Sequence, residues 1–172
     1  MGTFKFRGAI AELSAYAARY AFADDSVVVD RGQRCRSLGR IELDDLRVFA
    51  RWKSARIGRK IERNPLDLIE AVSQGVFSLD HPQVRIELLC MLHGVGYPFA
   101  STILHMTFPE EFALIDYRAL WSLGVEAPPS TYQYDFYSGY SRACADLAQR
   151  VGVSMRDLDR ALWQYSKEQQ RP

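Results

Sequence analysis

Asp116 is the first residue whose type and surroundings suggest chemistry. It follows an apolar run, 112–115, and precedes a short predicted helix that ends at Gly124, a residue type favoured just after a helix C-terminus. A carboxylate side chain can act as a general base or stabilise a developing positive charge. Aspartate is also a favoured N-cap residue, so a purely structural role for Asp116 is an open alternative.

Lys53 is the second candidate catalytic residue, and it depends on helical periodicity alone. If residues 43–63 form one helix, an apolar stripe contains Leu46, Ala50, Ile57 and Ile61. Lys53 falls inside this stripe, where a lysine must extend to solvent, pair with an acid or face a cavity. It could then pair with Asp116, contact a phosphate or act as a nucleophile. The alternative is a helix break near Ser54 that turns Lys53 toward solvent.

Basic residues are concentrated in one part of the chain, although the formal net charge is only +1. Residues 31–63 contain 11 Lys or Arg and 4 Asp or Glu, a local balance of 11 − 4 = +7, so the remainder carries 1 − 7 = −6. This asymmetry suggests a face for an anionic partner, with a salt-bridged surface helix as the alternative. Candidate phosphate contacts are Arg51, Arg56, Arg59, Lys60 and Arg63. Trp52 is a candidate for stacking on a base.

Two predicted helices are joined by the sequence Gly94-Val95-Gly96. Glycine allows positive φ angles and close backbone approach, and Val95 can fill the gap between the helices. The second helix would present its unpaired N–H groups near Tyr97, which suits a phosphate group. Such a turn would hold a DNA backbone without selecting a base sequence. Ordinary turn chemistry is the alternative.

The stretch from Leu92-His93-Gly94-Val95-Gly96 to Ile115-Asp116-Tyr117-Arg118 resembles the helix-hairpin-helix DNA glycosylase superfamily, which includes endonuclease III. That family combines a Leu-Pro-Gly-Val-Gly hairpin with a Val-Asp-Thr-His-Val-x-Arg segment. The family's catalytic aspartate follows its hairpin lysine by eighteen residues. Here Pro98 stands at the lysine position, and 98 + 18 = 116. The resemblance covers roughly residues 84–123.

The resemblance implies a DNA partner, a backbone contact made by Gly94, Val95, Gly96, Tyr97 and Arg118, and a catalytic Asp116. Removing a base builds positive charge on the sugar, which the carboxylate would stabilise, after the nucleotide has left the stack. Because Pro98 cannot form a Schiff base, lyase activity is not expected. The family's four-cysteine iron-sulfur loop is missing and Tyr117 replaces its threonine. No cofactor is therefore expected beyond a monovalent cation at the hairpin turn, which the resemblance allows.

Composition limits the remaining function classes. The three cysteines form no Cys-x-x-Cys pair, which argues against zinc and other metal sites and favours a reducing, cytoplasmic setting. The chain has neither a signal-peptide pattern nor 18 consecutive apolar residues, so no membrane partner is expected. Five aromatic residues could form a stacking surface or, as is commoner at helical spacing, part of the core: Tyr132, Tyr134, Phe136, Tyr137 and Tyr140.

Nearly every segment has helical period, which predicts an all-α fold: one compact multi-helix domain, 1–172, without an extended sheet. It would contain a helix-hairpin-helix at 82–107, the aspartate segment at 112–124 and outer helices at 6–22, 132–151 and 155–168. The Val27–Val29 run is the one plausible strand, and Gly32 and Gly39 would bracket a basic loop. Asn64 is the expected N-cap of the helix that begins at Pro65.

Three functional hypotheses follow. The first is a monofunctional DNA glycosylase that hydrolyses the N-glycosidic bond of a damaged or modified base. The second is a non-catalytic helix-hairpin-helix DNA-binding protein. The third is a small helical interaction protein whose protein partner the sequence does not identify.

Overall fold

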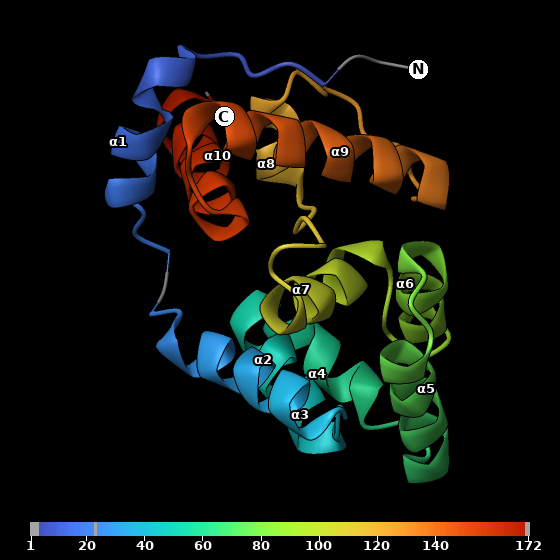
Figure 1. Cartoon of the computed structure of the whole chain (residues 1–172). Helices are drawn as coiled ribbons and strands as arrows, with labels where there is room; N and C mark the ends of the chain where they lie inside the picture. Colours follow the sequence, from blue (N-terminus) through green and yellow to red (C-terminus); the bar gives the residue numbers. More distant parts are fainter. Residues whose placement is uncertain (1–3, 23, 171–172) are drawn as a thin grey trace. The chain divides into compact units, whose positions relative to one another are not determined.

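The computed structural model describes residues 4–22 and 24–170, and within them it contains helices and no strand (Figure 1). This confirms the all-α prediction. The chain divides into two compact units. Unit 1 contains the described residues of Met1–Phe22 and Ala113–Pro172, and unit 2 contains those of Ala23–Phe112. The single domain expected over 1–172 stays a prediction, and its ends lie outside the described residues.

Unit 2 contains six consecutive helices: α2 (Ser26–Leu38), α3 (Leu43–Lys53), α4 (Ala55–Ile61), α5 (Leu66–Ser78), α6 (Pro82–Cys90) and α7 (Tyr97–Thr107). Helix α7 is buried over its last nine residues and packs against α2, α3 and α6. Helices α5 and α6 pack against each other (Figure 1). The core therefore forms around α7, which begins directly after the predicted glycine turn.

Local chemistry explains where several of these helices begin. A capping box starts α3, because the Asp45 carboxylate accepts the Glu42 N–H at 2.7 Å. Pro82 occupies the first turn of α6 and Pro98 the first turn of α7, where a missing N–H costs nothing. Gly39 ends α2 in the left-handed region, with φ +62°. The predicted bounds of the segment 82–107 agree with α6 and α7.

Unit 1 contains η1 (Ile10–Glu12), α1 (Leu13–Ala18), α8 (Tyr117–Ser122), α9 (Tyr134–Val151) and α10 (Met155–Gln169). Helix α10 packs against α1, α8 and α9. Before η1, the chain is extended, and the N–H groups of Lys5 and Arg7 donate to the carbonyls of Leu123 and Ser122, each at 2.9 Å. The predicted helix 6–22 is therefore too long at both ends.

The predictions for the start of unit 2 are wrong. The Val27–Val29 run lies in helix α2, not in a strand, and the stretch from Gly32 to Leu38 continues that helix instead of forming a loop. At Gly32 an added Cβ would lie 2.0 Å from the Met106 carbonyl oxygen of α7. Close packing of α2 against α7 therefore explains both the helix and the glycine within it, because tertiary contacts override local propensity.

No helix among the described residues combines the length and the apolar character needed to cross a bilayer.

Candidate nucleic-acid interface and candidate carboxylate

The turn between α6 and α7, residues 91–96, is called the glycine turn below. Gly94 has φ +85°, and a Cβ added there would lie 2.4 Å from the Cβ of Lys60. Val95 is buried, as expected for a side chain that fills the gap between two helices. Gly96 is exposed, its φ of −115° is accessible to any residue, and its only neighbour within 4 Å of an added Cβ is Pro98 Cδ, at 4.0 Å. Gly94 is required by the fold, whereas Gly96 is not.

Asn64 fastens the glycine turn to the end of α4. Its Oδ1 accepts the His93 N–H at 2.6 Å, and its Nδ2 donates to the carbonyls of His93 at 3.1 Å and Ile61 at 2.9 Å. The side chain is buried. The prediction that Asn64 caps the next helix is wrong, because Pro65 is the N-cap of α5. Sequence reasoning named Asn64 but missed its role at the glycine turn, since its partner there lies 29 positions away.

Helix α4 presents positive charge that no nearby acid neutralises. All four acids of residues 31–63 form salt bridges with arginines of the first half of this stretch, residues 31–47. Asp45 pairs with Arg31 and Arg34, Glu42 with Arg34 and Arg40, and Asp44 and Glu62 with Arg47. Five exposed basic side chains have no ion pair among the described residues: Arg51, Arg56, Arg59, Lys60 and Arg63. The earlier half of the basic stretch is therefore salt-bridged, and the later half is open to an anion.

The predicted continuous helix 43–63 is broken at Ser54, whose extended conformation (φ −172°, ψ 124°) separates α3 from α4. The alternative expected at this position is therefore the correct one. Lys53 is the last residue of α3 and is half-buried. It does not lie in an uninterrupted apolar stripe, so that argument for its catalytic role is lost, and the role stays a prediction.

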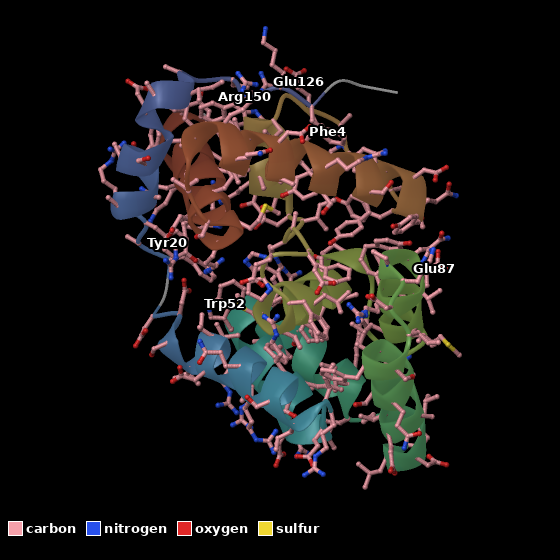
Figure 2. All side chains as sticks on the ribbon, viewed as in Figure 1. Phe4, Tyr20, Trp52, Glu87, Glu126 and Arg150 are labelled. Atoms are coloured by element: carbon pink, nitrogen blue, oxygen red, sulfur yellow. The ribbon has the colours of Figure 1, made fainter. Side chains whose placement is uncertain are left out.

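Trp52 packs locally. Its Nε1 donates to the Asp25 Oδ1 at 3.1 Å, and Asp25 is buried at the start of α2. Trp52 is labelled in Figure 2. The indole is half-buried. This contact orients the ring within unit 2, while stacking on a base stays a prediction.

Asp116 is the N-cap of α8 in unit 1. Its Oδ1 accepts the Ala119 N–H at 2.8 Å, and the backbone has the extended conformation usual for a cap. The side chain is partly exposed and does not lie in the packed interior. The structural role anticipated for Asp116 is therefore confirmed. The cap uses one carboxylate oxygen and fixes the direction of the group.

Two tyrosines of α9 hold the extended segment that leads into Asp116. Tyr137 donates its hydroxyl to the Ala113 carbonyl at 2.9 Å, and Tyr140 donates to the Leu114 carbonyl at 2.7 Å. Both rings are buried, which confirms a core role for these two members of the aromatic cluster. Phe4, which is labelled in Figure 2, packs edge-on against Phe136 and Tyr140.

The negative charge of Asp116 acts electrostatically on Tyr132. Burial and the Asp116 carboxylate together raise the pKa of the Tyr132 phenol. The phenol therefore stays protonated at neutral pH. The charge of Asp116 therefore acts on an aromatic residue within unit 1.

The side chain of Arg118 lies against aromatic rings. Its Cζ lies 5.1 Å from the ring centre of Tyr117 and 5.2 Å from that of Trp163, and its Nη1 lies 3.5 Å from the Ser166 Oγ. The half-buried Arg118 belongs to unit 1, whereas Gly94, Val95, Gly96 and Tyr97 belong to unit 2. Trp163 was not among the residues that the sequence singled out.

Comparison with protein-family models, with curated proteins and with solved structures finds no match for this chain. Among the described residues, no three His, Cys, Asp or Glu side chains are grouped as metal ligands would be.

Proposed function

We propose that this protein binds the DNA backbone through the glycine turn and α4, and that it acts as a monofunctional glycosylase with Asp116 as its carboxylate. One observation supports the DNA contact above all. Exposed basic side chains that have no ion pair among the described residues lie on the same short helix whose last turn contacts Gly94. The sequence resemblance to helix-hairpin-helix glycosylases supplies the reaction.

At the glycine turn, the open space at Gly96 would admit a phosphate group. Because Gly96 lacks a side chain and starts α7, a phosphate oxygen can approach the first N–H groups of this helix. The partial positive charge at a helix N-terminus favours an anion there. These contacts reach the backbone only, so they hold DNA without selecting a sequence.

Helix α4 would add charge at the same place. Lys60 contacts the turn through its Cβ, and Arg56 lies one helical turn earlier on the same helix. Side chains four residues apart lie on one face of a helix. Two cations on one face next to the glycine turn would neutralise successive phosphates and release their counterions.

For the reaction, Asp116 would stabilise positive charge at the sugar and accept a proton from water. The cap bond to Ala119 holds the carboxylate in one orientation before substrate arrives, which is an advantage for electrostatic stabilisation. Since Pro98 stands where the family has its lysine, the product would be an abasic site, without strand cleavage by β-elimination.

The DNA contact is tested by replacing Arg56 and Lys60 together with glutamine. We expect the affinity for a random-sequence duplex to fall about tenfold or more, because two phosphate contacts are lost. The matched control replaces Arg142 and Arg150, two exposed arginines of α9 without an ion pair among the described residues. Fluorescence anisotropy at fixed salt compares the two variants. Equal affinities for both would contradict the proposed interface.

The reaction is tested with Asp116→Asn on duplexes that carry a panel of damaged bases. Asparagine is as good an N-cap as aspartate, so the variant should keep its melting temperature. We expect loss of about 100-fold or more in the rate of abasic-site formation, the usual range for removing a general base. A variant that cleaves as fast as wild type would exclude Asp116.

A non-catalytic DNA-binding protein is the second candidate, because the cap bond to Ala119 already gives Asp116 a structural use. The assay of abasic-site formation, combined with duplex binding, distinguishes a glycosylase from a non-catalytic DNA-binding protein. Salt-sensitive duplex binding with no abasic product from any lesion would favour the non-catalytic protein.

A further inference from the structure

Unit 1 has a second set of residues that the proposed function does not use. Four side chains surround the Trp163 indole of α10, and a fifth, Tyr117, lies against one of them, Arg118. Together the six form what we call the Trp163 cluster: Tyr20, Phe22, Tyr117, Arg118, Trp163 and Lys167. They come from the segment after α1, the start of α8 and the middle of α10. Three separate parts of the sequence thus converge on one indole.

The cluster combines aromatic rings with two cations. The Trp163 ring centre lies 5.5 Å from that of Tyr20 and 5.1 Å from that of Phe22. Arg118 Cζ and Lys167 Nζ each lie 5.2 Å from the same indole. Both distances are within the range in which a ring attracts a cation.

Neither cation of the Trp163 cluster forms a salt bridge with a carboxylate among the described residues, although the charge of Lys167 helps to lower the pKa of the neighbouring Glu168 carboxyl. The acids of α10 are used elsewhere: Glu168 pairs with Arg19, Asp157 with Arg160 and Asp159 with Arg156. Arg118 reaches only the Ser166 hydroxyl, and Lys167 donates to the Ala21 carbonyl at 3.2 Å. The cluster therefore carries net positive charge.

Part of the aromatic surface lies open to solvent. Tyr117 is 59% exposed and Phe22 is 46% exposed, whereas Tyr137 and Tyr140 are almost completely buried. Rings that only complete a core would be covered. Exposed rings beside cations that form no salt bridge among the described residues complement a ligand that has flat apolar faces and negative charge.

We propose that the Trp163 cluster is a binding surface for single-stranded DNA, with bases stacked on Tyr117 and Phe22 and phosphates held by Arg118 and Lys167. Unpaired bases are required because base pairing and stacking hide the base faces within a duplex. The inference rests on the proposed function in taking DNA as the ligand, and it extends that function by naming the unpaired strand. Tyr117 follows Asp116 directly, so a stacked strand would bring its sugars near that carboxylate.

The experiment measures the affinity of the full chain for a fluorescein-labelled oligothymidylate of about twelve nucleotides by anisotropy. We expect Tyr117→Ala to weaken binding about tenfold, because the stacking of one base is lost. Tyr117→Trp should restore the affinity. Arg118→Gln with Lys167→Gln should weaken binding by more than the matched pair Arg142→Gln with Arg150→Gln.

A blunt duplex serves as the second ligand, and it separates this inference from the proposed function. Tyr117→Ala should leave duplex affinity unchanged, while Arg56→Gln with Lys60→Gln lowers it. If oligothymidylate binds Tyr117→Ala as tightly as wild type, the Trp163 cluster is not a stacking surface. Binding of an oligouridylate but of no DNA strand would also overturn the proposal, because the ligand would then be RNA.

The indole supplies an independent readout. Stacking of a base should quench part of the tryptophan fluorescence on titration with oligothymidylate, and Trp163→Phe should abolish that component while keeping a ring in the cluster. Quenching that persists in Trp163→Phe would assign the signal to Trp52 or Trp121 and overturn the proposal.

Discussion

At the scale of single residues, two glycines of similar sequence context have different functions. Gly94 is fixed by its backbone, since φ is +85° and Lys60 leaves no room for a methyl group. Gly96 has an ordinary φ and open space. A Gly-x-Gly pattern alone does not reveal this difference, because it depends on which helix lies against the turn.

The two glycines yield a paired prediction. Gly94→Ala should lower the free energy of unfolding by at least about 2 kcal/mol, because left-handed backbone strain and a steric clash add together. Gly96→Ala should leave stability unchanged or slightly higher and weaken duplex binding, since its methyl group occupies the proposed phosphate position. Urea unfolding and anisotropy check both parts. The reverse order of stabilities would contradict the structure of the turn.

Asp116 shows how a sequence can leave two roles open for one side chain. Its position predicted both an N-cap and a functional carboxylate, and the cap bond to Ala119 confirms the first. The two roles are compatible, because a carboxylate has two oxygens and accepts several hydrogen bonds.

At the scale of helices, most elements could be predicted from periodicity and end signals. Helices α6, α7 and α10 begin at or within one residue of the expected positions, because proline and serine mark their first turns locally. Helix α2 was missed, because three consecutive valines favour a strand and its buried Gly32 is explained only by the contact with α7. The break at Ser54 was anticipated as an alternative.

The pairing of α3 with α4 predicts a pH effect. Arg47 of α3 donates to Glu62 just after α4, with Nε–Oε1 2.8 Å, and this hydrogen bond lowers the pKa of the Glu62 carboxyl below its usual 4.5. A depressed carboxyl pKa stabilises the folded state above the unfolded pKa, and the contribution is lost as pH falls through the folded value.

We therefore expect Arg47→Gln to melt at a lower temperature than wild type at pH 7. The difference should shrink as the pH drops from 4.5 toward and below the lower folded pKa of Glu62. Thermal unfolding followed by circular dichroism at several pH values checks this. A difference that is unchanged in acid would assign the effect of Arg47 to packing instead of charge.

At the scale of the whole molecule, the small net charge conceals a local concentration of basic residues. Unit 2 contains 12 Lys or Arg and 13 Asp or Glu, a balance of 12 − 13 = −1. Within unit 2, residues 51–63 contain six basic residues and one acidic residue, a balance of 6 − 1 = +5. A locally basic surface on a nearly neutral unit suits a protein that contacts DNA at one place.

The candidate site could be predicted only in part. The glycine turn, the basic stretch and Asp116 were visible as local patterns. The buried clamp of Asn64 and the cluster around Trp163 were not, because each joins residues that are distant in the chain. Long-range contacts of this kind leave no periodic signal in a single sequence.

The buried amide of Asn64 has a thermodynamic consequence. Because it binds the end of α4 and the residue before Gly94 at once, the distance between the cationic side chains and the α7 N-terminus is set before any ligand arrives. Little backbone ordering then remains to oppose association. A phosphodiester strand would meet a template whose spacing is already fixed.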